Sequence, residues 1–327
     1  MSRHGLKMLT ALALLASAGP AHAVVGLDER AFIDDFLAIP TEVLGLVGDV
    51  LPERSQVGSS YLSGSFDPNL VIVEPANVMV TFVHEGAGYL NSLGYFTYTS
   101  DGSSIEIVDR QLVFPNASYA DPSKGWGGGK LETGDTVTLR DTDGDVRVFQ
   151  PGERVGFFLV SNGWQKNSSS VYGWSPSDPQ IPFTAPEENA KWRVMTTLDA
   201  INPEVSTGHA ERARHVAMLR IAGRSGFLGG EDFVLVGFED QRRDTGSDND
   251  FNDLVMIVRS NPIEAIDQTE IPYYAHDDPD PDGDGVEGLA DYFPNDPERA
   301  FIVRTPPTGW QTLAFEDRYP NAGDADC

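Results

Sequence analysis

Residues 233–258 read FVLVGFEDQRRDTGSDNDFNDLVMIV, which is a strand-like run, an acidic loop and a second strand-like run. Phe233–Phe238 and Leu254–Val258 consist almost entirely of the β-branched, aromatic and other apolar residues that buried strands favour. The loop between them crowds carboxylates that repel one another unless a cation is shared among them. This stretch therefore predicts two strands that bring an acidic cluster to one place.

Similar strand-like runs occur along the chain from Tyr61 onward, separated by Gly, Asn, Asp and Pro. They cover residues 78–83, 94–99, 105–108, 113–114, 136–139, 155–160, 192–198 and 215–221. Helix-length periodic segments do not occur between them, which disfavours crossover helices and a parallel sheet. We therefore predict an all-β fold, an antiparallel β-sandwich of jelly-roll type, over residues 61–262.

The first 23 residues have the pattern of a secretory signal. Arg3, His4 and Lys7 form a basic start, residues 8–18 an apolar core, and Ala21-His22-Ala23 a small-x-small cleavage site. The apolar core is too short to span a membrane, and later apolar runs are shorter than the roughly 18 residues that a span requires. We expect an exported protein, extracellular or periplasmic, cleaved after Ala23 and without a transmembrane segment.

Residues 24–60 are predicted to form a short helical segment before the sandwich. Within Asp28–Leu51, apolar side chains recur at steps of three and four residues, with an interruption at Pro40. These apolar positions are Phe32, Phe36, Leu44, Val47 and Leu51.

The charge balance limits the possible partners. The chain has 50 Asp and Glu against 23 Lys and Arg, a formal net charge of −27. Such a chain is a poor partner for nucleic acid or for an anionic membrane surface. Its single cysteine, Cys327, is the last residue, so the sequence implies neither a disulfide framework nor a thiolate metal site.

The loop after Phe238 is predicted to bind calcium. If the segment is extended, alternate residues project to one side, and Phe251 on the other side would pin the loop to the sandwich. Oxygen ligands without cysteine in an exported protein favour Ca²⁺. Glu85, at a strand end, is a further candidate ligand. The predicted ligands are Glu239, Asp240, Asp248, Asp250, Asn252 and Asp253.

A different interpretation of this loop stays open. It could be an acidic hairpin that keeps a sheet edge soluble, with local ion pairs among Arg242, Arg243 and Asp244. Another segment, Asp141–Asp145, also alternates aspartates, but Val146 stands where a calcium loop needs glycine. We predict a simple hairpin turn there.

Residues 263–327 are predicted to form a small, loop-rich acidic module. Its segment 280–286 reads DPDGDGV, which places carboxylates at loop positions 1, 3 and 5 and glycine at position 6. A backbone carbonyl at position 7 and a carboxylate at position 12 would complete a calcium site. The predicted ligands are Asp280, Asp282, Asp284, Val286 and Asp291.

Several motifs resemble a known family. Val236–Asp240 and Asp248–Val255, within the stretch 215–258, are similar to the bacterial domain of unknown function family 4114. Residues 83–89, 91–95 and 152–160 are similar to the same family, so the resemblance covers roughly residues 51–258. It implies an exported or cell-surface bacterial protein that binds calcium, with no defining enzymatic activity.

The C-terminal part resembles two other types of sequence. The loop at Asp280–Asp291 is similar to the calcium loops of thrombospondin type 3 repeats. Together with Leu313–Pro320 and Gly323-Asp324 it looks like the start of an LruC domain. LruC domains normally continue through a further Asn-Asp and strand, so we expect this module to be truncated at Cys327.

Two classes of function remain open from the sequence. The leading interpretation is a secreted, non-catalytic calcium-binding module for cell-surface attachment or matrix interaction. The alternative is a carbohydrate-binding module or a glycan-active hydrolase whose acidic pair would act as acid and base. Loop tryptophans, if exposed, would stack on the sugar rings of a surface glycan. These are Trp126, Trp164 and Trp174.

Overall fold

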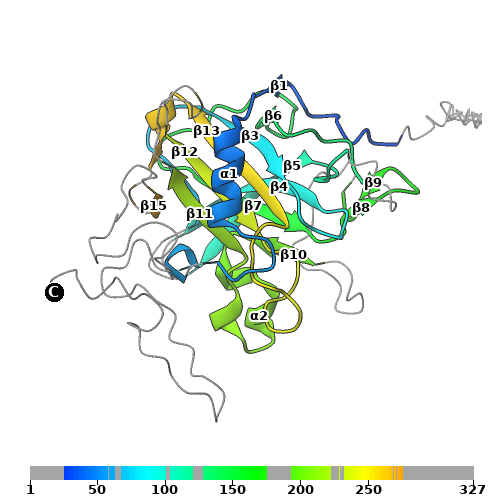
Figure 1. Ribbon diagram of the computed structural model, residues 1–327. Helices are drawn as coiled ribbons and strands as arrows, with labels where there is room; N and C mark the ends of the chain where they lie inside the picture. The colour runs from blue at the N-terminus through cyan, green and yellow to red at the C-terminus, as the bar shows by residue number, and fades with distance from the viewer. Residues whose placement is uncertain are drawn as a thin grey trace, which may run out of the picture.

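The computed structural model describes residues 26–57, 59–62, 68–100, 104–120, 128–174, 193–221, 228, 232–267, 269 and 271–274. The signal-like segment and the acidic module from residue 275 onward lie outside these residues. The described chain folds into two β-sheets with short helices at their margins (Figure 1). The prediction of an all-β sandwich is thereby confirmed.

One sheet carries the quoted stretch at its centre. In spatial order its strands are β1 (Asp35–Phe36), β6 (Asp135–Thr138), β3 (Asn77–His84), β13 (Leu254–Asn261), β12 (Phe233–Phe238), β11 (Val216–Ile221) and β15 (Tyr273–Tyr274). Neighbouring strands are antiparallel except β11 and β15, which are parallel.

The other sheet is formed by strands from the middle of the chain. In order they are β14 (Ile266–Asp267), β2 (Leu70–Ile72), β7 (Arg154–Val160), β4 (Ser92–Ser100) and β5 (Ile105–Phe114). Beside this path, β10 (Val194–Thr196) pairs with β7, and a separate small hairpin joins β8 (Trp164–Gln165) to β9 (Ser170–Val171). The two strands predicted at 105–108 and 113–114 are one strand, β5.

The short helices lie in the connections. They are α1 (Thr41–Val50), α2 (Pro203–Ser206) and the 3₁₀ turns η1 (Ser59–Leu62), η2 (Asp199–Ile201), η3 (Ala210–Arg212) and η5 (Ile263–Ala265). None of the helices in the described part of the chain is long and apolar enough to cross a membrane.

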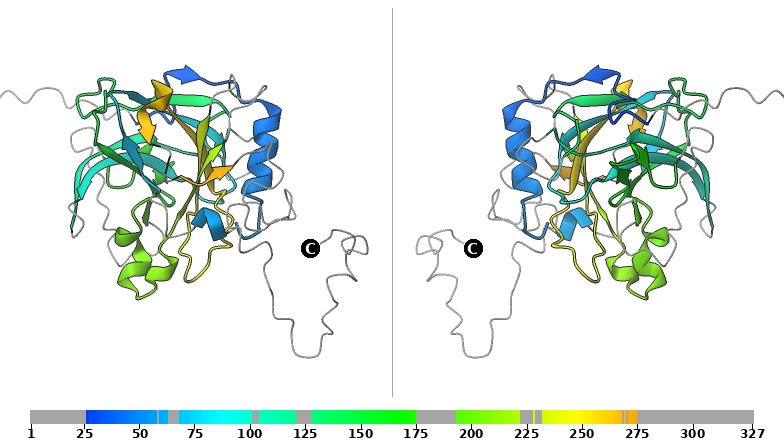
Figure 2. Two further views of the ribbon diagram at one scale, coloured as in Figure 1. Left: turned by 90° about the vertical axis from the view of Figure 1, so that its left-hand side faces the viewer. Right: turned by 90° about the vertical axis from the view of Figure 1, so that its right-hand side faces the viewer.

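The centre of the first sheet is buried on both faces, which explains why its strands are continuously apolar. In β12, Val234, Val236 and Phe238 belong to the core between the sheets. Phe233 and Leu235 instead belong to a second cluster on the outer face. Helix α1 covers this outer face, as Figures 1 and 2 show. Because side chains alternate between the two faces of a strand, each central strand contributes side chains to two separate cores.

Helix α1 is shorter than the sequence predicted. The expected helical segment was Asp28–Leu51, whereas the helix begins at Thr41, directly after its N-cap Pro40. Proline is tolerated at a helix start and disfavours helical conformation in the preceding residue, which separates the two halves. The half before Pro40 contains β1, whose Asp35 and Phe36 pair with β6. Residues 35–36 therefore belong to the sandwich.

The sandwich also extends past the boundary predicted at residue 262. Strand β14 pairs with β2, and β15 pairs with β11, so residues assigned to the acidic module complete both sheets. Ile266 and Ile271 are buried in the core between the sheets. Their apolar side chains are the physical reason that this segment packs on the sandwich.

Candidate metal centre

The acidic loop begins and ends at the paired ends of two neighbouring strands. Phe238, the last residue of β12, pairs with Leu254, the first residue of β13. Glu239 and Asp240 therefore leave the sheet beside Asn252 and Asp253, which enter it. The backbone N–H of Asp240 donates to Asp253 Oδ2 at 2.7 Å, which closes the neck of the loop.

The loop backbone is twisted, in contrast to the extended segment that the sequence predicted. Asn249 and Phe251 adopt left-handed conformations, with φ of 63° and 55°. Such values are uncommon for residues other than glycine, especially for a bulky aromatic residue. Phe251 is nevertheless fully buried in the outer core beneath α1, in agreement with its predicted role as an anchor. Burial of this ring offsets the strained backbone that carries it.

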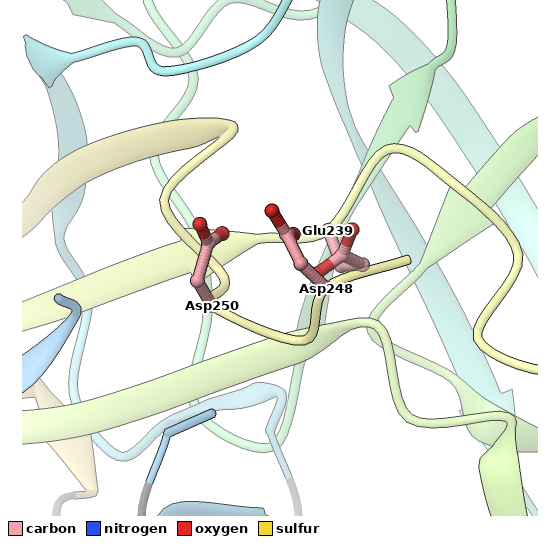
Figure 3. Close-up of side chains that lie close together, drawn as sticks. All are labelled: Glu239, Asp248 and Asp250. Atoms are coloured by element: carbon pink, nitrogen blue, oxygen red, sulfur yellow. The ribbon is translucent and has the colours of Figure 1, made fainter. Parts of the chain in front are cut away.

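Three carboxylates converge inside the loop. Glu239 comes from the end of β12, while Asp248 and Asp250 come from the returning segment (Figure 3). One oxygen of each lies within 4.8 Å of the others. Glu239 and Asp250 are 1% and 3% exposed, and Asp248 is exposed to solvent. The cluster is thus open to solvent on one side only.

Glu239 is the most unusual member of this set. Among the described residues, its Oε2 atom is buried without a hydrogen-bond partner. A buried carboxylate oxygen without a hydrogen-bond partner is costly, because it has lost its water and no donor has replaced it. A cation held between Glu239, Asp248 and Asp250 would supply the missing partner.

Burial shifts the proton affinities of this region upward. Burial, together with the negative charge of Asp253, raises the pKa of Glu239 to about 10, although a hydrogen bond from Ser247 opposes the shift. Burial and the charge of Asp253 likewise raise the pKa of Asp240 well above its usual range. Burial raises the pKa of Asp253 to about 6 and also raises that of Asp250. Without a cation, this site therefore retains protons.

The other predicted ligands lie beside the cluster and have partners of their own. Asp240 Oδ2 accepts a hydrogen bond from Asn91 Nδ2 at 2.7 Å, and Asp253 closes the neck of the loop. Asn252 Nδ2 donates to Glu53 Oε2 at 3.3 Å. The structure thus places all six predicted residues together, with three of them converging on one point. The C-terminal set, Asp280, Asp282, Asp284, Val286 and Asp291, lies outside the described residues.

Ion pairs form in the loop but do not neutralise the cluster. Arg242 pairs with Asp244, as the alternative interpretation required. Arg243 donates to Asn249 Oδ1 at 2.7 Å and to the carbonyl oxygen of Arg214 at 2.8 Å. Within the described part of the chain, Glu239, Asp248 and Asp250 have no Lys or Arg ion-pair partner.

Several residues around the site were not predicted from the sequence. Asn91 anchors Asp240, and Glu53 and the backbone N–H of Arg54 contact the loop from the segment that follows α1. Glu85, considered as a ligand, is buried, and its charge raises the pKa of Asp240. Because these contacts join distant parts of the chain, local spacing gives no signal for them.

Of the three tryptophans considered for sugar stacking, the structure describes Trp164 and Trp174, and neither side chain is fully exposed. Trp164 is only 4% exposed and lies in a third apolar cluster. Trp174 is partly buried against the same cluster, and Trp126 lies outside the described residues. The expectation of exposed loop tryptophans is therefore wrong for Trp164, whose apolar neighbours Phe158 and Val171 bury it.

Comparisons with known proteins support part of the predicted resemblance. Neither the curated proteins nor the solved structures give a significant match to this chain. A family model does match, and its span includes the 152–160 and 215–258 motifs together with the acidic loop, while the motifs before residue 149 lie outside it. Residues 149–261 match the family described as Domain of unknown function (DUF4114).

Proposed function

We propose that this protein is a secreted, non-catalytic calcium-binding module used for cell-surface attachment or matrix interaction. The observation that carries the proposal is the buried, partnerless Oε2 of Glu239 at the convergence of three carboxylates. The secretory pattern of residues 1–23 and the net charge of −27 are compatible with an exported protein in a calcium-rich medium.

The donor set favours calcium among the common metal ions. The converging groups are all carboxylate oxygens. Zinc prefers nitrogen and sulfur ligands, and Mg²⁺ demands near-octahedral geometry and retains its waters. Ca²⁺ accepts six to eight oxygens in flexible geometry. An irregular, twisted loop suits it best.

A second ion would bind in the acidic module from residue 263 onward. The support is the spacing of Asp280, Asp282, Asp284 and Asp291 around Gly285. We propose that this loop is of the thrombospondin type 3 kind and opens an LruC-like domain. It would bind calcium independently of the loop at 239–253.

Catalysis is the second candidate, and one observation favours it. Glu239 has the raised pKa that a general acid requires, with other carboxyl groups close by. Against it, three carboxylates converge on one point, which suits an ion more than an acid–base pair on either side of a sugar bond. Release of reducing ends from glycans would support a hydrolase. Glycan binding without product release would support a carbohydrate-binding module.

Thermal unfolding with calcium and with chelator tests the proposal directly. At millimolar Ca²⁺ and a Kd of about 10–100 µM, an ion that binds only the folded state adds roughly 1.4–2.7 kcal/mol. The melting temperature should therefore rise by several degrees in calcium, and elemental analysis should find the metal. An equal concentration of Mg²⁺ controls for ionic strength. An unchanged melting temperature would reject the proposal.

A matched variant separates the two sites. Asp282→Ala combined with Asp284→Ala should remove one calcium-binding event in calorimetric titration. The calcium-dependent shift of the sandwich melting temperature should remain, because the loop at 239–253 is intact. Loss of both signals together would show that the two sites are not independent.

A further inference from the structure

The segment that follows α1 is hydrogen-bonded to the acidic loop at three points. Arg54 N donates to Asp250 Oδ2 at 2.8 Å, and Val57 N donates to the carbonyl oxygen of Asn249 at 3.1 Å. In the opposite direction, Asn252 Nδ2 donates to Glu53 Oε2 at 3.3 Å. The first of these contacts joins residues 196 positions apart in the chain. The position of residues 53–57 and the conformation of the loop therefore depend on each other.

Helix α1 depends on this region for its own stability. It has only 10 residues, and its N-cap, Pro40, makes no side-chain hydrogen bond. Helices shorter than about 12–15 residues are marginal in water, so burial of an apolar face must hold them. The buried face is Val43, Leu46, Val47 and Val50, and it packs in the same cluster as Phe251.

Phe251 links the helix to the candidate ligands. It stands between Asp250 and Asn252 in the chain, yet its ring lies in the apolar cluster beneath α1. At Gly237 of β12, an added Cβ would lie 2.3 Å from the Phe251 carbonyl oxygen and 2.6 Å from Leu51 Cδ1. Strand, loop and the end of the helix therefore meet with no space between them.

The docked segment also orients a candidate ligand. Asp250 Oδ2 accepts from Arg54 N, and Asp250 Oδ1 accepts from Asn252 N at 3.2 Å. One donor thus belongs to the loop itself and the other to the segment after α1. If the segment after α1 undocks with the helix, Asp250 loses one of these two donors, and its carboxylate is less firmly oriented beside Glu239 and Asp248.

We propose that the loop at 239–253 is an ion-dependent clamp on the N-terminal helix, in which ion binding and α1 docking stabilise each other. The inference rests on the proposed calcium site, and Arg54 and Glu53 act in it as positioning residues. The coupling is reciprocal by thermodynamic necessity: an ion that favours the docked helix is bound more tightly when the helix is docked. Without the ion, α1 should leave the outer face of β11–β13 more often.

Two leucines on the same helix provide a matched pair of variants. Leu46 is 1% exposed and belongs to the cluster with Phe251, whereas Leu44 is 40% exposed. Leu46→Ala should undock α1 in part and weaken Ca²⁺ binding by at least about fivefold, because only the docked fraction binds tightly. Leu44→Ala should change the affinity by less than about twofold. Leu46→Met, which restores the volume, should recover the affinity.

Hydrogen exchange on the wild-type full chain gives a second readout. Added Ca²⁺ should slow the exchange of the backbone amides of residues 41–57 by at least about fivefold. The amides of β5, on the other sheet, serve as an internal reference. This measurement requires no variant, so it decides the proposal even if Leu46→Ala fails to fold.

The outcomes distinguish failure of the proposed calcium site from failure of the clamp alone. If the wild-type chain binds no Ca²⁺, the proposed function fails, and the clamp fails with it. If Ca²⁺ binds but all leucine variants share one affinity and exchange at residues 41–57 is unchanged, only the clamp is rejected. Titrations are performed well below the melting temperature, so that global unfolding of Leu46→Ala does not imitate a loss of affinity.

Discussion

Two aspartate-rich loops of this protein look alike in sequence and differ in structure. In the loop at 141–145, Asp141 Oδ1 accepts backbone N–H groups from Asp143 and Asp145, each at 3.0 Å. Asp143 and Asp145 are exposed, and the flanking residues Arg140 and Val146 form a β-bridge. This is the hairpin turn that the sequence predicted. Backbone N–H groups satisfy Asp141, and the carboxylates of Asp143 and Asp145 are open to solvent.

The loop at 248–253 differs from this hairpin in the burial of its polar side chains. It buries Asp250 and Asn252, and a neighbouring strand adds the buried Glu239. The buried ring of Phe251 holds the loop in place. The comparison shows that alternating aspartates do not by themselves make a candidate ion site. The site arises because an apolar anchor and a second strand remove these carboxylates from water.

The largest difference between the two loops should lie in their anchors. Phe251→Ala should destabilise the protein by about 3–5 kcal/mol, the usual cost of removing a buried aromatic ring. Val146→Ala, beside the other loop, should cost less than about 0.5 kcal/mol because Val146 is 44% exposed. Urea denaturation in chelator measures both. Similar costs would contradict the distinction between an anchored loop and a free turn.

The second-largest difference between the two loops should be their effect on how the stability of the protein changes with pH. The folded state raises the pKa of Glu239 to about 10, so it retains a proton that the unfolded chain releases near pH 4.5. Stability from this group is therefore complete below pH 4.5 and is lost as the pH rises toward 10. One retained proton corresponds to about 1.4 kcal/mol per pH unit, or roughly 3 kcal/mol between pH 5 and 7.

Glu239→Gln isolates this contribution, because it removes the titrating group and retains the shape. In chelator, the stability of the wild type relative to the variant should fall as the pH rises from 5 to 7. Calcium should reverse the trend for the wild type, since the ion replaces protons and its binding should release them. Asp143→Asn in the exposed loop should leave the pH profile unchanged. Equal profiles for all three proteins would refute the assignment.

The smallest effect concerns one exposed aspartate in each loop. Asp248→Asn removes one charge from the converging set and should weaken calcium binding by about tenfold, or roughly 1.4 kcal/mol. Asp143→Asn makes the same change in a loop of similar composition and should leave the affinity unaltered. Calorimetric titration of both variants decides the matter. A weaker affinity in Asp143→Asn would place an ion in the hairpin.

Much of the sandwich followed from local patterns. The runs 78–83, 94–99, 155–160 and 233–238 all lie within strands β3, β4, β7 and β12, because β-branched and aromatic residues suit a buried pleated surface. The central strands are continuously apolar, so the sequence alone could not show which of their side chains pack in which of the two cores. The helix before Pro40 was predicted in error, since spacing at three and four residues does not report pairing with a distant strand.

The sequence by itself determined most of the longer strands, the acidic loop between β12 and β13, and the identity of the residues gathered there. Only the tertiary structure decided that Glu239, Asp248 and Asp250 converge while Asp240, Asn252 and Asp253 bond elsewhere. It also decided that residues 53–57 hold the loop and that Trp164 is buried. The physical reason is the distance along the chain over which each effect acts. Strand propensity and loop chemistry act between neighbours, whereas burial and convergence depend on segments that meet across as many as 199 positions of chain.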